Sequence, residues 1–219
     1  MPGAERRIVI LISGRGSNME AILNACKSGS LHGTVAAVIS NRPDAKGLST
    51  ASAAGIETKA IDHKAYESRD NFDRALADAI DSYRPDVLVL AGFMRILTEG
   101  FVAKFLGKMI NVHPSLLPDY PGLNTHQRAI DNGDEEAGAT VHYVTGELDG
   151  GPAILQGSVN ILDNDTADAL AARILPTEHQ MLVTAVGWHL DGRLAHCESG
   201  AYLDNSRLPL RGVNWSTVT

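Results

Sequence analysis

A run of apolar residues near the start of the chain, RIVILI at residues 7 to 12, limits the possible folds more than any other segment. Side chains of a strand alternate between two faces, so a strand is apolar throughout only when both faces are buried. The glycine-rich stretch SGRGSN follows at once, and a helical pattern then runs from Asn18 to Lys27 and ends at Gly29. A buried strand, a tight turn and a helix in this order are typical of a parallel α/β sheet.

The same alternation continues along the chain. Further strands are predicted at residues 34–40, 57–62, 86–93, 108–113, 138–145 and 153–162. Further helices are predicted as an alanine-rich segment closing at Gly55, an apolar stripe from Phe72 to Ile80 that Pro85 stops, and the segment 98–107 with Thr98 as its cap. A long helix is expected from about Thr166 to Leu190, interrupted or offset near Pro176.

Strands that alternate with helices indicate a mostly parallel, twisted sheet covered by helices on both faces. The polar segment 192–219 is expected to add a C-terminal antiparallel hairpin and then a loose end. No repeat or linker divides the 219 residues, so one domain, 1–219, is predicted, with an ordered core at about 7–204 and a tail at 205–219. In such sheets, ligands bind at the carboxyl ends of the strands, near the point where strand order reverses.

Composition narrows the classes of partner. The formal charge is −7, from 19 basic and 26 acidic residues, which gives no broad attraction to nucleic acid or to anionic membranes. Cys26 and Cys197 are too far apart for a C-x-x-C pair, so neither a metal site nor a disulfide framework is predicted, and a reducing cytoplasm fits best. The apolar run at 8–12 is too short for a signal peptide. Small-molecule partners are therefore expected, in a monomer or a homodimer.

The turn after the first predicted strand is a candidate anion site. Glycines allow a tight turn, and the backbone N–H groups of Gly16, Ser17 and Asn18 would point outward at the start of the helix, where a phosphate binds well. The turn lacks the dinucleotide glycine pattern and the lysine of a P-loop. An ordinary strand-to-helix turn capped by Ser17 or Asn18 is the alternative.

A bulky apolar stretch, LAGFMRIL, stands where the strand at 86–93 should give way to solvent. Phe93, Met94, Ile96 and Leu97 could line a pocket for a flat heteroaromatic ligand, whose ring edges the backbone would bind. The same residues could also be plain core beneath the next helix.

The segment NVHPSLLPDYPG is the strongest candidate for catalysis. Strand alternation places Asn111 and His113 on one face, where an amide can donate to an oxyanion and an imidazole can transfer a proton. Pro114 restricts the backbone of His113, and Pro118 and Pro121 stiffen the loop that follows. A strand whose histidine simply bonds to backbone is the alternative.

A fourth motif, GELDGGP, places Asp149 in a turn that should return to the same rim of the sheet. A carboxylate beside an imidazole favours the protonated ring and can relay a proton through water. An aspartate serving only the turn is the competing interpretation, unless the loop closes over His113.

Together these motifs resemble the folate-dependent formyltransferases, whose shared element is N-x-H-P-S-L-L-P. The combination of SGRGSN with GFMRIL is similar to the narrower family of glycinamide ribonucleotide formyltransferases. The similar stretches, among them NRPDAKGL, GDEEAGATVHYVTGELDGGPAILQ and PTEHQML, keep their order from about residue 7 to residue 204. GLNTH departs from the family pattern, because Asn124 stands where the family often has histidine.

The resemblance implies a Rossmann-like formyltransferase fold and transfer of formyl from 10-formyltetrahydrofolate to the amine of 5-phosphoribosylglycinamide, without a metal. It implies a catalytic set of Asn111, His113 and Asp149. Gly16, Ser17, Asn18 and Glu178 would bind the ribotide. Arg69, Met94, Arg95, Ile96, Leu97 and Asn111 would bind the folate.

Three other functions remain open at this stage. A formyltetrahydrofolate deformylase would use the same catalytic set to pass formyl to water, but usually carries an extra N-terminal domain, and only six residues precede the first strand here. A methionyl-tRNA formyltransferase would need a further domain and a basic surface. A non-catalytic nucleotide sensor would have no use for Asn111, His113 and Asp149 together.

Overall fold

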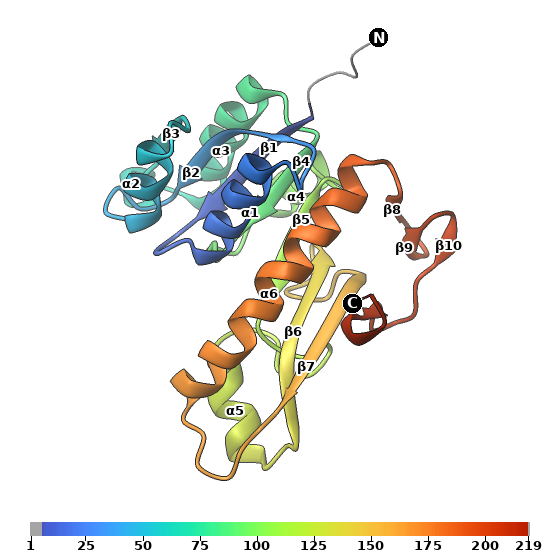
Figure 1. Ribbon diagram of the computed structural model, residues 1–219. Coiled ribbons are helices and arrows are strands. Elements are labelled where there is room, and N and C mark those ends of the chain that lie inside the picture. The colour runs from blue at the N-terminus through green and yellow to red at the C-terminus, as the bar shows by residue number, and fades with distance from the viewer. Residues whose placement is uncertain (1–5, 219) are drawn as a thin grey trace.

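The computed structural model describes residues 6–218 and contains an eight-stranded sheet in the order β11-β7-β6-β5-β4-β1-β2-β3 (Figure 1). Its strands are β1 (Arg7–Ile12), β2 (Thr34–Ser40), β3 (Thr58–Ala60), β4 (Val87–Leu90), β5 (Met109–His113), β6 (Glu136–Tyr143), β7 (Ala153–Asn160) and β11 (Val213–Asn214). A second, antiparallel sheet contains β8 (Leu194–Cys197), β9 (Gly200–Leu203) and β10 (Ser206–Arg207).

The helices cover both faces of the large sheet. They are α1 (Ser17–Ser28), α2 (Lys46–Ala53), α3 (Arg69–Tyr83), α4 (Glu99–Lys104), α5 (Thr125–Asn132) and α6 (Ala167–Leu190), with short 3-10 turns at His63–Ala65 and Trp215–Thr217. None of the helices in the described part of the chain combines the length and the apolar character that crossing a bilayer requires.

Strand β1 shows why the apolar run at 7–12 folds as it does. Ile8, Ile10 and Ile12 pack into one core with α1 and α6, whereas Val9 and Leu11 pack into a second core with α3 and α4. All five side chains are 0% exposed. Both faces of the strand are therefore buried, as the sequence predicts.

The order of the strands creates the place where a ligand should bind. From β3 through β2, β1 and β4 to β5 every pairing is parallel, and the chain leaves β1 towards β2 on one side while β4 joins it on the other. The order reverses between β1 and β4, so the loops after these two strands diverge and leave a crevice at their carboxyl ends. Beyond β5 the sheet turns antiparallel at β6 and β7.

Most predicted elements are confirmed, and three segments differ. Helix α6 continues unbroken through Pro176, because Leu170, Ile174, Met181 and Leu182 are all fully buried and hold both halves against the sheet. Helix α5 at 125–132 follows the proline loop, where the sequence predicted no helix. The expected hairpin is present as β8 and β9, but the segment after it is not loose over its described residues, since β11 pairs in parallel with β7.

Candidate active site

His113 and Asp149 meet at the rim of the large sheet, although they lie on different segments of the chain. His113 ends β5, and its Nδ1 lies 3.5 Å from Oδ2 of Asp149 in the loop after β6. The side chains are only 7% and 11% exposed. Nε2 of His113 donates to the carbonyl oxygen of Tyr120 at 3.0 Å. Both ring nitrogens therefore face oxygens that can only accept, an arrangement that suits the doubly protonated ring.

Asn111 lies two residues earlier on β5 and contacts a third polar residue. Strands β5 and β6 pair so that Asn111 stands directly opposite His142. The amide nitrogen of Asn111 lies 3.0 Å from Nε2 of His142, and that same Nε2 is 4.0 Å from Oδ1 of Asp149. Asn111, His113, His142 and Asp149 thus form one polar cluster around β5, the interior strand that pairs in parallel with β4 and antiparallel with β6.

Two loops hold this cluster in place. Oδ2 of Asp149 accepts a hydrogen bond of 2.9 Å from the backbone of Gly122, which joins the proline loop to the loop after β6. Asp149 itself adopts φ 51°, in the left-handed region that aspartate tolerates better than most residues. A Cβ added at Gly151 would lie 1.7 Å from the carbonyl oxygen of Tyr143, so only glycine allows this loop to close.

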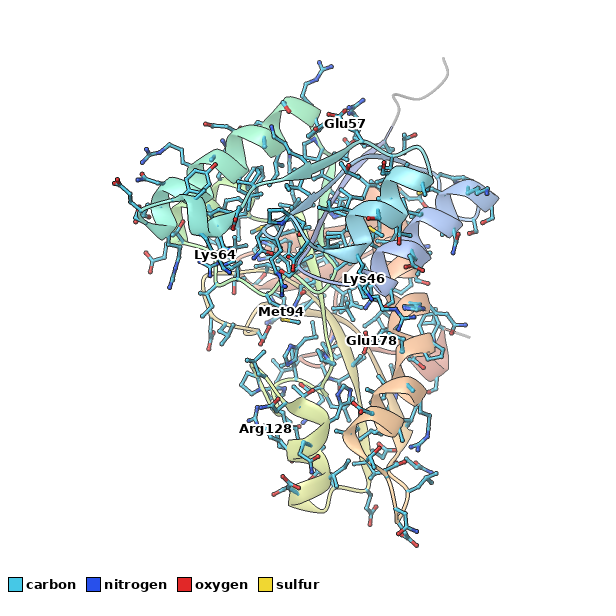
Figure 2. All side chains as sticks on the ribbon, turned by 90° about the vertical axis from the view of Figure 1, so that its left-hand side faces the viewer. Lys46, Glu57, Lys64, Met94, Arg128 and Glu178 are labelled. Carbon is cyan, nitrogen blue, oxygen red and sulfur yellow. The ribbon has the colours of Figure 1, made fainter. Side chains whose placement is uncertain are left out.

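A cavity of about 610 Å³ lies next to the cluster, and some of the residues expected to bind folate line it. Asn111, His113 and Asp149 line it together with Met94, Arg95 and Ile96. Met94 and Ile96 are 68% and 58% exposed, which is unusual for large apolar side chains and typical of a surface that binds a ligand. Figure 2 shows Met94 near the middle of the molecule, above Arg128 of α5.

Two residues of the expected folate set do not line that cavity. Leu97 is partly buried and packs against the core formed by α3 and α4. Arg69 is the exposed first residue of α3. The sequence left open whether LAGFMRIL lines a pocket or packs in the core, and the segment contains residues of both kinds. Phe93, for example, is 8% exposed and belongs to the core, but it also borders the cavity.

A second cavity, of about 500 Å³, lies over the glycine-rich turn. Gly16, Ser17 and Asn18 line it, and Gly16 precedes α1 with φ 79° and provides no side-chain cap. The positive end of the helix dipole and free N–H groups at the first turn favour an anion there. Three cationic side chains, Arg15, Arg42 and Arg95, also line this cavity, which suits a phosphate.

The two cavities share one wall. Gly92, Met94 and Arg95 line both of them. This wall follows β4, and the backbone N–H of Met94 donates to the hydroxyl of Ser13 at 2.7 Å, which ties it to the end of β1. The cavities consequently meet at the point where strand order reverses.

Glu178 reaches the glycine-rich turn from α6. It is 7% exposed, and its Oε2 accepts a hydrogen bond of 3.0 Å from the side-chain amide of Asn18. Burial raises the pKa of Glu178, and the bond from Asn18 partly opposes that rise. Glu178 lines neither cavity directly, and its contact with the glycine-rich turn is the bond from Asn18.

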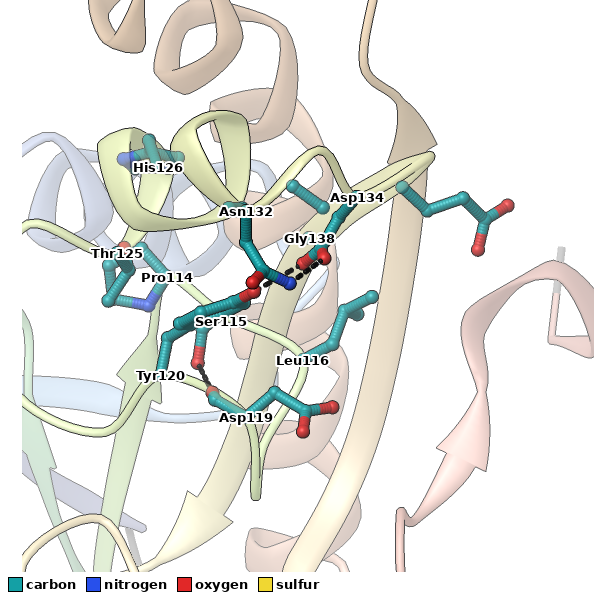
Figure 3. A pocket seen from close by; sticks show the side chains of 13 residues that line it. Pro114, Ser115, Leu116, Asp119, Tyr120, Thr125, His126, Asn132, Asp134 and Gly138 are labelled. Carbon is teal, nitrogen blue, oxygen red and sulfur yellow. Dashed lines mark hydrogen bonds between the residues drawn. The ribbon is translucent and has the colours of Figure 1, made fainter.

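A third cavity, of about 310 Å³, lies behind the proline loop (Figure 3). The hydroxyl of Tyr120 donates to Asp134 at 2.6 Å, and Asn132 donates to the other oxygen of that carboxylate at 2.6 Å. These bonds anchor Tyr120, whose carbonyl oxygen in turn accepts from His113. His126 lines both this cavity and the 610 Å³ cavity. Burial lowers the pKa of His126, and the nearby charge of His113 lowers it further.

The geometry adds two residues that sequence reasoning missed. His142 was concealed within a predicted strand, yet the antiparallel register of β5 and β6 puts it beside Asn111. Tyr120 contributes only its carbonyl oxygen, so no side-chain pattern could indicate it. Asn124 lines the 610 Å³ cavity at the start of α5. Among residues 6–218 no group of three or more His, Cys, Asp or Glu side chains is arranged to hold a metal ion.

Comparison with known proteins identifies consistent relatives. The family model described as formyl transferase matches residues 6–186. Phosphoribosylglycinamide formyltransferase of Escherichia coli is 52% identical over 205 residues, covering 94% of this chain and 97% of the relative. The structure of phosphoribosylglycinamide formyltransferase from Coxiella burnetii superposes with a TM-score of 0.92 at 45% identity, covering 96% and 99% of the two chains. A formyltetrahydrofolate deformylase from Pseudomonas syringae superposes with a TM-score of 0.84 at 26% identity, covering 92% of this chain and 66% of its own.

Proposed function

The chain belongs to the formyl transferase family and is a formyltransferase, and on this premise we propose that it formylates 5-phosphoribosylglycinamide with 10-formyltetrahydrofolate in purine biosynthesis. The two relatives that it resembles most closely among those above carry the name of that activity, at 52% and 45% identity.

The observation that carries the proposal is the position of the polar cluster between two kinds of cavity. One cavity is lined by exposed apolar side chains and suits a flat heterocycle, and the other is lined by arginines and a helix N-terminus and suits a phosphate. Three members of the cluster, Asn111, His113 and Asp149, line the first cavity beside the wall that both cavities share. A folate and a phosphorylated amine bound in this way would bring their reacting groups to the same place.

The proposed reaction is a direct attack of the amine on the formyl carbon. The new C–N bond forms as the carbonyl oxygen becomes an oxyanion, to which the amide of Asn111 and protonated His113 donate. A proton then passes from the attacking nitrogen to N10 of the folate, with Asp149 and His113 as its carriers, and the bond from the formyl carbon to N10 breaks. No covalent enzyme intermediate is needed, because the amine is itself the nucleophile.

One hydrogen bond must be exchanged for this to happen. Nε2 of His113 donates to the carbonyl oxygen of Tyr120, whereas Nδ1 faces Asp149. The oxyanion can accept a hydrogen bond from Nε2 only when the carbonyl oxygen of Tyr120 moves away from that N–H group. We therefore expect substrate to displace this loop by a small distance, while the bond from Gly122 to Asp149 keeps the carboxylate in place.

The alternative of hydrolysis has a specific observation in its favour, since the deformylase from Pseudomonas syringae shares the fold. A hydrolase would need the polar cluster and the folate cavity, but would gain nothing from the arginine-lined cavity over the glycine-rich turn. The presence of that second cavity favours a phosphorylated acceptor over water.

The deciding experiment mixes the protein with 10-formyltetrahydrofolate, with and without 5-phosphoribosylglycinamide, and measures released tetrahydrofolate and formylated ribotide. Stoichiometric formation of both products only when the ribotide is present is the expected result. Release of folate at the same rate without the ribotide would show that the reaction is hydrolysis rather than transfer.

The variant Asn18→Ala should raise KM for the ribotide at least tenfold with a smaller effect on kcat. An unchanged KM would show that the phosphate does not bind at the glycine-rich turn.

A further inference from the structure

His142 is a buried histidine within the polar cluster that the proposed chemistry leaves without a role. It is 2% exposed and lies on β6, directly across the antiparallel ladder from Asn111. Residues opposite each other in such a ladder project from the same face of the sheet. Its imidazole is therefore a fixed neighbour of the Asn111 amide.

The contacts of His142 decide which of its nitrogens carries a proton. Nδ1 lies 2.9 Å from the carbonyl oxygen of Tyr143, and because a carbonyl can only accept, Nδ1 must be the protonated nitrogen. In the neutral ring, Nε2 is then bare and can only accept. The group that faces it at 3.0 Å is the side-chain amide of Asn111.

A bare Nε2 permits only one orientation of that amide. The NH₂ group of Asn111 can donate one hydrogen to Nε2, whereas a flipped amide would direct its oxygen lone pairs at the lone pair of Nε2. With one amide hydrogen committed to His142, the second remains for an oxygen in the cavity that Asn111 lines. A flipped amide would instead present an acceptor to the developing oxyanion and would repel it.

We propose that His142 is a positioning residue for formyl transfer, whose neutral Nε2 holds the amide of Asn111 with its NH₂ group directed at the reacting oxygen. The proposal rests on the proposed function, since it assigns His142 a part in that reaction. It differs from the role of His113, because His142 touches neither substrate nor the transferred proton.

The surroundings of His142 favour the neutral ring. Burial lowers the pKa of His142 to about 4, although the Tyr143 carbonyl and the charge of Asp149 act in the opposite direction. The charge of His113 acts with burial. A protonated His142 would also draw Asp149, whose Oδ1 is 4.0 Å away, from its pairing with His113. Neutrality of one histidine thus protects the ion pair of the other.

The first test needs no substitution. In the wild-type protein labelled with ¹⁵N in its histidines, the ring signals of His142, assigned by their loss in a His142 variant, should show a protonated Nδ1 and a bare Nε2 at pH 7. A ring protonated at Nε2, alone or together with Nδ1, would overturn the proposal. This spectrum does not depend on activity, so it remains decisive even if the wild-type protein transfers no formyl group and the proposed function itself fails.

The second test compares three variants by steady-state kinetics. His142→Leu removes the acceptor and should lower kcat by about 10- to 100-fold, below the full loss of one oxyanion donor, with KM for the ribotide within about twofold. His142→Gln keeps a carbonyl oxygen near the place of Nε2 and should restore kcat to within about fivefold of wild type. His189→Leu is the matched control, because His189 is another histidine with little exposure, partly buried and bonded to the Tyr143 hydroxyl at 3.1 Å, but it lines none of the cavities described.

A double-mutant cycle shows whether His142 acts through Asn111. In the Asn111→Ala background, His142→Leu should lower kcat by no more than about twofold further, since no amide remains to be oriented. An equal fold-loss in both backgrounds would assign His142 a merely structural role. So would a loss of kcat in His142→Gln as large as in His142→Leu when both variants unfold at the same urea concentration as wild type.

Discussion

Replacing Asp149 by asparagine tests the ion pair on which the proposed chemistry depends. The substitution removes one negative charge and changes almost nothing else in shape. The amide oxygen of asparagine can still accept the bond from Gly122, and asparagine also tolerates the φ of 51° at this position. The expected defect is therefore in catalysis rather than in folding.

The magnitude follows from the geometry. At 3.5 Å and an effective dielectric constant of about 20, Coulomb's law gives roughly 5 kcal/mol between the charges of His113 and Asp149. Exposures of 7% and 11% mean that solvent screens this pair little. The cost of taking the two charges out of water offsets part of this attraction, so we expect the transition state to lose about 3–4 kcal/mol, or a fall in kcat of about 10²- to 10³-fold.

The assay is steady-state formylation of the ribotide, with urea unfolding of the same samples. Asp204→Asn is the matched control, because Asp204 also has a positive φ, of 50°, and pairs with Arg193, but it lies on the surface in the turn between β9 and β10. It should leave kcat unchanged. If Asp149→Asn keeps kcat within threefold of wild type while its unfolding midpoint is also unchanged, the ion pair has no part in the reaction.

Three further predictions concern the loop, the buried acid and the core. Gly151→Ala places a Cβ 1.7 Å from the Tyr143 carbonyl oxygen, so kcat and thermal stability should both fall. Gly146→Ala, in the same loop, adds a Cβ that meets nothing within 4 Å and should change neither quantity. Equal behaviour of the two variants would refute the requirement for glycine at position 151. Burial raises the pKa of Glu178 in the folded state above its ordinary 4.5, so the folded state binds more protons than the unfolded state. The free energy of unfolding of wild type should therefore decline, relative to that of Glu178→Gln, as pH rises above about 4.5. Unfolding free energies of the two proteins that run parallel from pH 4 to 7 in urea titrations would contradict this sign. Leu88→Ala, at a side chain that is 0% exposed on β4, should lower the free energy of unfolding by about 2–5 kcal/mol, and a loss below 1 kcal/mol would show that the core relaxes into the space.

Elements with strong local signals were predictable from the sequence. The strand at 7–12 matches β1 in both bounds, because its apolar run reflects burial on both faces. Thr98 caps α4 as expected, with its hydroxyl accepting from the backbone of Phe101. Pro176 was misleading, since the missing N–H interrupts one hydrogen bond, whereas burial of the residues around it is worth more than that bond.

Pairings between distant segments were less accessible. From the residues alone, closure of Asp149 onto His113 was one of two interpretations of a turn, and the family resemblance favoured it. The structure brings the two side chains to 3.5 Å. His142 escaped notice because strand alternation along one segment does not reveal which residue faces it across the ladder. The strand β11 is two residues long and polar on one side, so no periodicity could show that it joins the edge of the sheet.

Strand β5 is hydrogen-bonded on both sides, to β4 and to β6, so it lies in the interior of the sheet rather than at an edge. The backbone N–H groups of Asn111 and His113 should therefore exchange with deuterium only when the whole sheet opens, whereas the backbone N–H groups near Asp149 in the loop should exchange far sooner. Mild denaturant should accordingly abolish turnover at concentrations where most of the helical circular dichroism persists. Asn111 and His113, held by the sheet, would then keep their positions while the loop that carries Asp149 is displaced.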